Sequence, residues 1–200
     1  MRIDHKIILD WIKPNARVLD LGCGDGTLLK LLNEKKSTHS YGIDIDEENI
    51  LQCIRNGVSV IEQDIEKGLS NFDDKSFDTV IMSHAIQTLQ HPDKALQEML
   101  RIGRECIITF PNFGHWKARF QLAWNGRMPV SDILPFEWYN TPNIHFCTFR
   151  DFELLSQEMQ ASILNREVVA TKSFGRALQR LHPNLFGETA LYRVTHQNKV

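Results

Sequence analysis

The chain has 200 residues, of which 42% are hydrophobic and 24% charged, a composition typical of a globular domain and unlike that of a disordered chain. This length fits a single domain, so residues 1–200 are expected to fold around one core. The net charge of −2 favours neither a nucleic-acid partner nor a membrane surface. No apolar run approaches the roughly 18–20 residues that cross a bilayer, and the amino terminus lacks the apolar core of a secretory signal, so we expect a cytoplasmic protein.

The four cysteines are Cys23, Cys53, Cys106 and Cys147, and no two of them form a Cys-x-x-Cys pair. Neither a disulfide framework nor a zinc site is indicated, and the histidine pairs also lack a third ligand at suitable spacing, so no metal is expected. Cys23 lies at the start of a predicted helix. The helix terminus could lower the pKa of this thiol, or the thiol could simply be small and buried.

Short strand patterns alternate with helical patterns along most of the chain. Near-continuous apolar runs, typical of strands covered on both faces, predict strands at 16–21, 40–45, 58–62, 77–83 and 105–110. Amphipathic helices are expected in the intervals between these strands. A helix near 150–160 precedes two more expected strands, near 163–171 and 189–196. Such alternation gives an open α/β sheet with parallel strands.

Residues 111–149 interrupt this alternation. The segment contains four of the seven prolines and three of the four tryptophans, which predicts a loop-rich lid or docking insertion. Within it, Trp116, Phe120 and Trp124 recur every four residues and would share one helix face. That face either packs on the domain's own sheet or forms a docking surface, since Trp and Arg are enriched at interfaces. The expected docking residues are Trp116, Arg119, Phe120, Trp124, Trp138 and Tyr139.

The strongest local signal is VLDLGCGDG, residues 18–26, in which a buried strand runs into a glycine-rich turn that opens a helix. Glycines let the backbone approach a ligand closely. A tight connection with nothing bound is the alternative, because a lone glycine-rich turn is weak support for a site.

Acidic residues follow the next two strands. Asp44 closes the second strand 22 residues after Gly22, where a carboxylate can accept the hydrogen bonds of a ribose diol. Asp64 closes the third strand, where an acceptor could meet an adenine amino group. Each aspartate alone also fits a surface loop or a helix cap. In combination with the glycine turn they indicate a nucleoside site.

Charge distinguishes between nucleoside ligands. Asp20 and Asp25 flank the glycine turn, so a pyrophosphate would meet carboxylates where it needs amide donors. S-adenosylmethionine carries a sulfonium and an ammonium group beside its adenosine, and the acidic turn suits these charges better than it suits NAD. We therefore expect S-adenosylmethionine, or its product S-adenosylhomocysteine, as the ligand.

Four segments within residues 16–89 resemble the successive motifs of class I S-adenosylmethionine-dependent methyltransferases: VLDLGCGDG, YGIDID, IEQD and FDTVIMSHAIQTL. The resemblance implies a Rossmann-like methyltransferase fold, with a mostly parallel seven-stranded sheet, helices on both faces and an antiparallel carboxy-terminal hairpin. It also implies that the glycine turn contacts the methionine moiety, Asp44 the ribose and Asp64 the adenine. The expected cofactor-binding residues are Asp20, Gly22, Cys23, Gly24, Asp25, Asp44, Ile45, Asp64, Ile65 and Ser83.

A second resemblance covers residues 112–153, from NFGHWKARF to TFRDFE, which are similar to the MetW family of methionine biosynthesis. Together the two resemblances cover nearly the whole chain. Members of that family are associated with homoserine O-acyltransferase and support its activity, so the resemblance implies this enzyme as a partner. The alternative is a methyltransferase that acts on a small molecule.

The end of the fourth strand reads SHAIQ, residues 83–87, and lacks the Asn/Asp-Pro-Pro-Tyr/Phe signature that favours amino-nitrogen targets in nucleic acids or proteins. Methylation of nucleic acid therefore loses support. His84 is the one candidate catalytic residue, because a histidine can act as a general base near neutral pH. A lone histidine at a strand end more often packs or bonds locally, which is the alternative.

Overall fold

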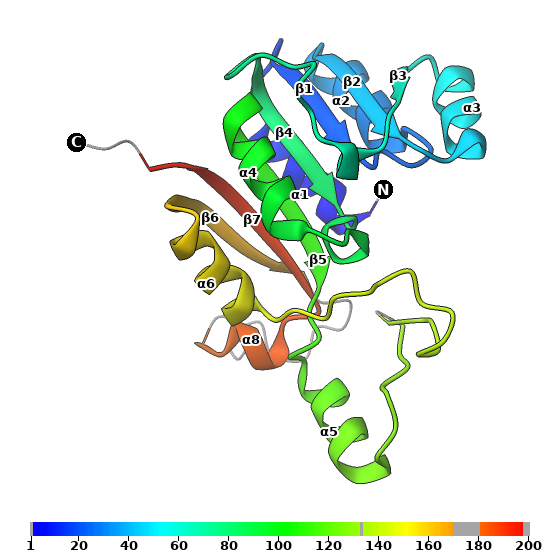
Figure 1. Ribbon diagram of the computed structural model, residues 1–200, viewed down its shortest axis with the longest axis vertical. Helices are drawn as coiled ribbons and strands as arrows, with labels where there is room; N and C mark the ends of the chain where they lie inside the picture. Colours follow the sequence, from blue (N-terminus) through cyan, green and yellow to red (C-terminus); the bar gives the residue numbers. More distant parts are fainter. Residues whose placement is uncertain (1, 133, 170–180, 198–200) are drawn as a thin grey trace.

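The computed structural model describes residues 2–132, 134–169 and 181–197, and a seven-stranded sheet with the order β3-β2-β1-β4-β5-β7-β6 forms its centre (Figure 1). The first five strands are parallel, and β7 lies antiparallel between β5 and β6. The strands are β1 (Arg17–Leu21), β2 (His39–Asp44), β3 (Ser59–Glu62), β4 (Phe77–Ser83), β5 (Gly103–Pro111), β6 (Ala161–Val169) and β7 (Thr189–His196).

All seven expected strands are present, and the predicted fold class is confirmed. The fifth strand is longer than expected and the sixth begins two residues earlier, at Ala161; residues 170–171 of the expected strand lie outside the described residues. The strand order reverses between β1 and β4. An open α/β sheet places its ligand crevice at such a point, outside the carboxyl ends of the strands.

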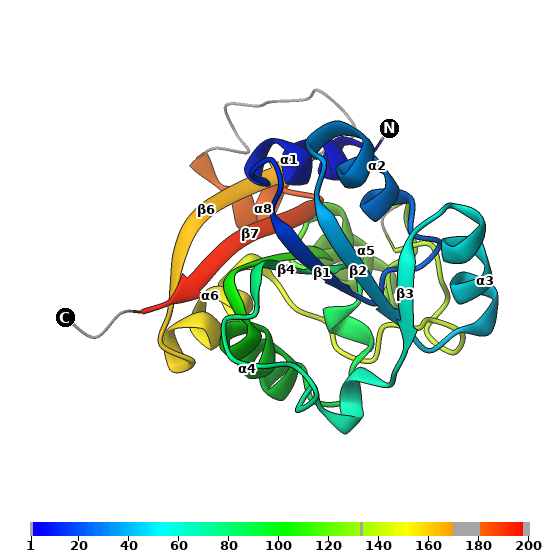
Figure 2. The same ribbon diagram turned by 90° about the horizontal axis from the view of Figure 1, so that it is seen from above.

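Helices cover both faces of the sheet (Figure 2). One face carries α1 (Ile3–Trp11), α2 (Thr27–Lys36) and α3 (Glu47–Arg55), and the other carries α4 (Pro92–Ile102) and α6 (Phe149–Glu158). Shorter helices are η1 (Ile65–Lys67), η2 (Ile86–Thr88) and α8 (Pro183–Phe186). No helix in the described ranges is both long and apolar enough to cross a membrane.

The apolar runs of the central strands supply both cores because successive side chains point to opposite faces. Val18 of β1 packs in the cluster of α1 and α2, while its neighbour Leu19 packs in the cluster of α4 and α6. Ile107 and Ile108 divide in the same way on β5. Each of these side chains is at most 1% exposed, and such burial contributes about 1.5–3 kcal/mol per aliphatic side chain.

Helix α5 (Trp116–Asn125) begins beyond the end of β5 and projects past the carboxyl edge of the sheet (Figure 1). Its aromatic stripe is open to solvent, since Trp116, Phe120 and Trp124 are 44%, 58% and 80% exposed. The alternative in which this stripe packs on the domain's own sheet is therefore wrong. Ala118 is the one buried residue of α5, because the helix leaves the layer that covers the sheet.

Candidate functional site

The turn between β1 and α2 contains three glycines in the left-handed conformation. Gly22, Gly24 and Gly26 have φ angles of 73°, 56° and 73°, which side chains rarely tolerate. A Cβ atom at Gly24 would meet nothing within 4 Å, whereas one at Gly22 would lie 3.0 Å from the Cβ of Ala85. The turn therefore has open space at Gly24 and lies close against the residues that follow β4.

Asp44 fixes this turn to the end of β2. Its Oδ2 accepts a hydrogen bond of 2.8 Å from the backbone amide of Gly24, and its Oδ1 accepts from the amides of Ile45 and Asp46 at 2.9 and 3.0 Å. The side chain is buried. Because a carboxylate oxygen has two lone pairs, Oδ2 keeps the capacity to accept a hydroxyl from a ligand.

Asp20, on β1, is a buried acid whose side chain lacks a full set of hydrogen-bond partners among the described residues. Its Oδ1 has no hydrogen-bond partner among the described residues, although the side chain is only 2% exposed. Burial, and to a lesser extent the negative charge of Asp44, raises the pKa of Asp20 to about 7. An unpaired buried polar group is costly, and an acid perturbed in this way beside a crevice is typical of a functional site. A ligand cation would supply the missing donor.

Asp25 and Asp64 both bond to the first residues of a neighbouring helix, and Asp64 is the N-cap of η1. Asp25 accepts from the amide and the hydroxyl of Thr27 at 3.0 and 2.7 Å, and these two hydrogen bonds hold the pKa of Asp25 below its ordinary value. Asp64 accepts from the amide of Glu66 at 3.0 Å, at the start of η1. The helix-cap role that the sequence left open is thus present for Asp64. Asp25 is exposed and Asp64 half-buried, so contact of either with a ligand stays a prediction.

Two expected cofactor-binding residues, Ile45 and Ile65, follow the acidic strand ends. Ile45, after Asp44, is 64% exposed, and Ile65, after Asp64, packs partly against the core. An exposed isoleucine at a strand end offers an apolar surface to a flat ring, as ligand pockets commonly do.

Cys23 is buried in the turn, and its Sγ lies 3.7 Å from the Sγ of Cys53. Burial raises the pKa of both thiols, so the alternative of a thiol activated by the helix terminus is wrong and the small buried thiol is confirmed. The Cys23 side chain also explains why a glycine stands at position 42 on the adjacent strand, because any side chain there would collide with the Cys23 sulfur. Across the residues that the structure describes, no three His, Cys, Asp or Glu side chains form a group that could hold a metal ion.

The end of β4 brings His84 against α1. His84 has a φ of 58°, its amide donates to the Thr109 carbonyl at 2.9 Å, and the hydroxyl of Ser83 lies 3.1 Å from that of Thr109. The Nε2 of His84 lies 3.2 Å from Oδ2 of the buried Asp4. Burial alone would raise the pKa of Asp4, but hydrogen bonds from His84 and Arg2 hold it well below the usual range. An anionic carboxylate therefore orients the imidazole, a geometry that suits a general base and also anchors α1.

Asp4 and Gln87 also lie at this edge, and no pattern in the sequence pointed to a role for either. Gln87 is buried in η2, where its backbone carbonyl accepts hydrogen bonds from the amides of Ile144 and His145 at 2.9 and 3.0 Å. Its Nε2 donates to the carbonyl of Pro111 at 3.2 Å. Gln87 thus joins the returning chain of the insertion to the segment that follows β4.

The expected docking residues fall into two exposed groups. On α5 the rings of Phe120 and Trp124 stack with centroids 5.8 Å apart, and in the following loop Trp138 and Tyr139 meet edge to face at 5.8 Å. Arg119 is exposed as well, although its Nε donates to the carbonyl of Gly114 at 2.6 Å. No helix or strand is assigned from 126 to 148 among the described residues.

This architecture is that of the class I S-adenosylmethionine-dependent methyltransferase fold, and solved structures agree. A SAM-dependent methyltransferase from Archaeoglobus fulgidus superposes with a TM-score of 0.68 at 19% identity, covering 96% of this chain and 90% of that chain. The [4+2]-cyclase SpnF superposes equally well, with a TM-score of 0.68 at 14% identity, covering 96% of this chain and 80% of that one. Likeness at this identity shows the fold alone, and one fold hosts several chemistries.

The sequence comparison narrows the class to a family. The family described as methionine biosynthesis protein MetW matches residues 2–194, and the chain belongs to it. The bifunctional methionine biosynthesis protein MetXA/MetW of Rhodopirellula baltica is 32% identical over 209 residues. That match covers 100% of this chain and 33% of the relative, so the chain spans about a third of the relative's length.

Proposed function

We propose that this protein binds S-adenosylmethionine or S-adenosylhomocysteine at the carboxyl edge of the sheet and supports a homoserine O-acyltransferase as its partner. The observation that carries the binding proposal is the buried Asp20 carboxyl, whose Oδ1 has no partner among the described residues, beside an open glycine turn. Membership of the MetW family and the relative whose name joins MetXA and MetW support the partnership.

The residues of the site fit the chemistry of this ligand. The unpaired oxygen of Asp20 suits a cationic methionine moiety, and the Oδ2 of Asp44 suits a ribose hydroxyl. The exposed side chain of Ile45 suits the face of an adenine ring. Bound S-adenosylmethionine supplies a sulfonium-activated methyl group, whereas S-adenosylhomocysteine lacks it.

Titration calorimetry with S-adenosylmethionine tests the binding proposal. Asp44→Asn should bind about ten- to a hundredfold more weakly than the native protein, because hydrogen bonds to a charged group contribute about 1.5–3 kcal/mol. Asp46→Asn is the matched control, since the Asp46 side chain caps α3 by accepting a hydrogen bond from the amide of Asn49 at 3.0 Å. Equal affinities of the native protein and Asp44→Asn would contradict the assignment.

A small-molecule methyltransferase is the second candidate, and the Asp4–His84 pair favours it. With Nε2 toward Asp4, the Nδ1 of His84 could accept the proton of a hydroxyl or amine acceptor as the acceptor takes the methyl group. His84→Asn keeps a residue that tolerates a positive φ, and it should slow such turnover about 10²–10⁴-fold without weakening ligand binding. Sustained release of S-adenosylhomocysteine with a metabolite pool supports this candidate, and its absence refutes it.

A further inference from the structure

The insertion between β5 and α6 gathers an unusual share of exposed apolar side chains. Twenty-one large hydrophobic side chains are exposed among the described residues, and eleven of these lie within residues 116–146. We call these eleven side chains the insertion surface. Its aromatic members are Trp116, Phe120, Trp124, Phe136, Trp138, Tyr139 and Phe146. Exposed apolar side chains concentrated in this way mark an interaction site, whereas single ones need no explanation.

The insertion surface is held in place by polar contacts at its base. The Nδ2 of the buried Asn112 donates to the carbonyl of Gly187 at 2.7 Å, and its Oδ1 accepts from the amide of Gly114 at 2.9 Å. Gln87 holds the returning chain at Ile144 and His145. A surface anchored at both ends loses less conformational entropy when a partner binds.

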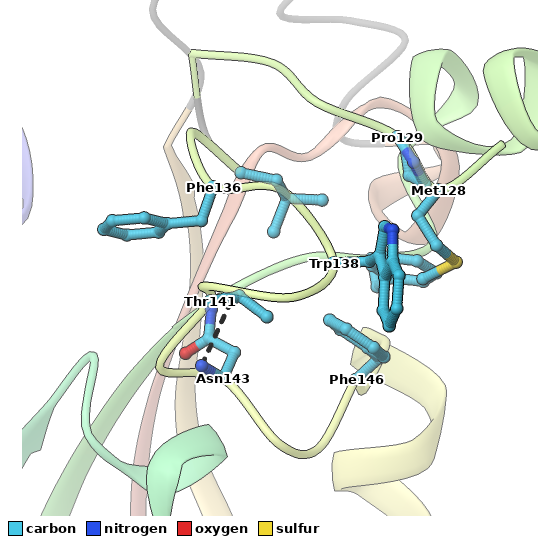
Figure 3. Close-up of a pocket in the computed structure, with 9 residues that line it drawn as sticks. Met128, Pro129, Phe136, Trp138, Thr141, Asn143 and Phe146 are labelled. Atoms are coloured by element: carbon cyan, nitrogen blue, oxygen red, sulfur yellow. Dashed lines mark hydrogen bonds between the residues drawn. The ribbon is translucent and has the colours of Figure 1, made fainter.

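A small pocket of about 20 Å³ lies within the insertion surface (Figure 3). Trp138, Met128 and Phe146 line it with apolar groups, and Thr141 and Asn143 form a polar edge. An apolar depression with a polar edge is the kind of surface at which binding hot spots pair across an interface.

The charges around α5 indicate which kind of protein the insertion surface binds. The helix and its end carry Lys117, Arg119 and Arg127, and residues 116–127 contain no acidic side chain. In a two-fold contact centred on α5, the two copies of the helix would place these cations opposite one another. A different protein that offers an apolar projection with carboxylates at its rim is the better complement.

We infer that the insertion surface is the docking site for the homoserine O-acyltransferase. This inference rests on the proposed function and adds the surface through which it operates. The relative from Rhodopirellula baltica, whose name joins MetXA and MetW, makes the acyltransferase the one occupant to consider. The surface also borders the cofactor edge, since Gln87 contacts the insertion while the nearby Ala85 lies against Gly22.

Binding of the homoserine O-acyltransferase from the same source, measured by calorimetry, tests the inference. Trp124→Ala and Trp138→Ala should each weaken the complex at least about tenfold. Ile54→Ala is the matched control, because Ile54 is 61% exposed on α3, away from the insertion, and it should bind like the native chain. All three variants should keep the native melting temperature and the native affinity for S-adenosylmethionine.

The possible failures are distinguishable. If the native chain binds the acyltransferase and both tryptophan variants bind equally well, the inference is wrong and the proposed function stands. If the native chain does not bind, the proposed function fails and the inference fails with it. Sedimentation that shows a dimer of the native chain, lost in Trp124→Ala with acyltransferase affinity unchanged, would assign the surface to a second copy and overturn the inference.

Discussion

Protonation of Asp20 should control how tightly a cationic ligand binds. Because burial and the charge of Asp44 raise the pKa of Asp20 to about 7, the ligand-free carboxyl is protonated below neutral pH. A ligand cation favours the carboxylate, so binding must release that proton. The affinity for S-adenosylmethionine should therefore fall by up to about tenfold per pH unit below 7. Calorimetry between about pH 5.5 and 7.5 measures this slope, and below about pH 7 the ligand's own amino group stays largely protonated.

The matched variant is Asp20→Asn, which has no proton to release. Its affinity should be lower than that of the native protein at pH 7.5 and flat across the same range. A native slope that persists in the variant would assign the titration to another group.

Asp20 should also lower the free energy of unfolding of the ligand-free protein at neutral pH. The pKa of Asp20 is raised from 3.8 to about 7 on folding, so its favourable contribution is complete below about pH 4 and is lost as the pH rises toward 7. At about 1.36 kcal/mol per pKa unit, the loss reaches at most about 4 kcal/mol. In urea unfolding, Asp20→Asn should be more stable than the native protein at pH 8, with a smaller difference at pH 4.5. If the native protein is more stable than Asp20→Asn at pH 8, the raised pKa of Asp20 is contradicted.

At the scale of elements, the base of α5 depends on Asn112. Asn112→Ala removes the donor to the Gly187 carbonyl and the acceptor for the Gly114 amide, and it leaves both groups in a buried site. We expect a loss of about 2–3 kcal/mol and faster amide exchange along α5. Asn71→Ala is the control, because Asn71 is exposed and bonds only to Gln63, and its effect should stay within about 0.5 kcal/mol. Similar losses of stability in the two variants would contradict the proposal that Asn112 anchors the base of α5.

The elements that the sequence predicted best are those whose signals are local. Each parallel strand is a short apolar run followed by a turn, and Asp44 and Asp64 lie directly after strands, so their place at one edge follows from the topology alone. The role of Asp4 was not predictable, because its partner His84 lies 80 positions away and meets it only through the packing of α1.

The exposure of the α5 stripe was not predictable for a related reason. A pattern of Trp116, Phe120 and Trp124 states that three rings share a helix face, but not what that face meets. The direction of α5 is set by contacts between distant parts of the chain, such as those from Asn112 to residues that precede β7. Periodicity alone therefore left both alternatives, core packing and docking surface, open.

For the whole molecule, the fold places the glycine turn and the insertion surface side by side. The glycine turn lies against Ala85, and two residues further Gln87 bonds to the returning insertion. A ligand that fixes the turn and a partner that contacts the insertion would then bias the same short segment after β4. Coupling of this kind requires that each binding event change the affinity of the other by the same factor. We expect the acyltransferase affinity of the native chain to differ with and without S-adenosylmethionine, and an identical affinity in both conditions would exclude the coupling.

The most direct test of the central claim is the rate of acyl transfer to homoserine by the acyltransferase of the same source, measured as this chain is added. We predict that the rate rises with the native chain and saturates, and that Trp124→Ala needs at least about tenfold more protein for the same rate. A rate that stays unchanged at every concentration of the native chain, with and without S-adenosylmethionine, would contradict the proposed function.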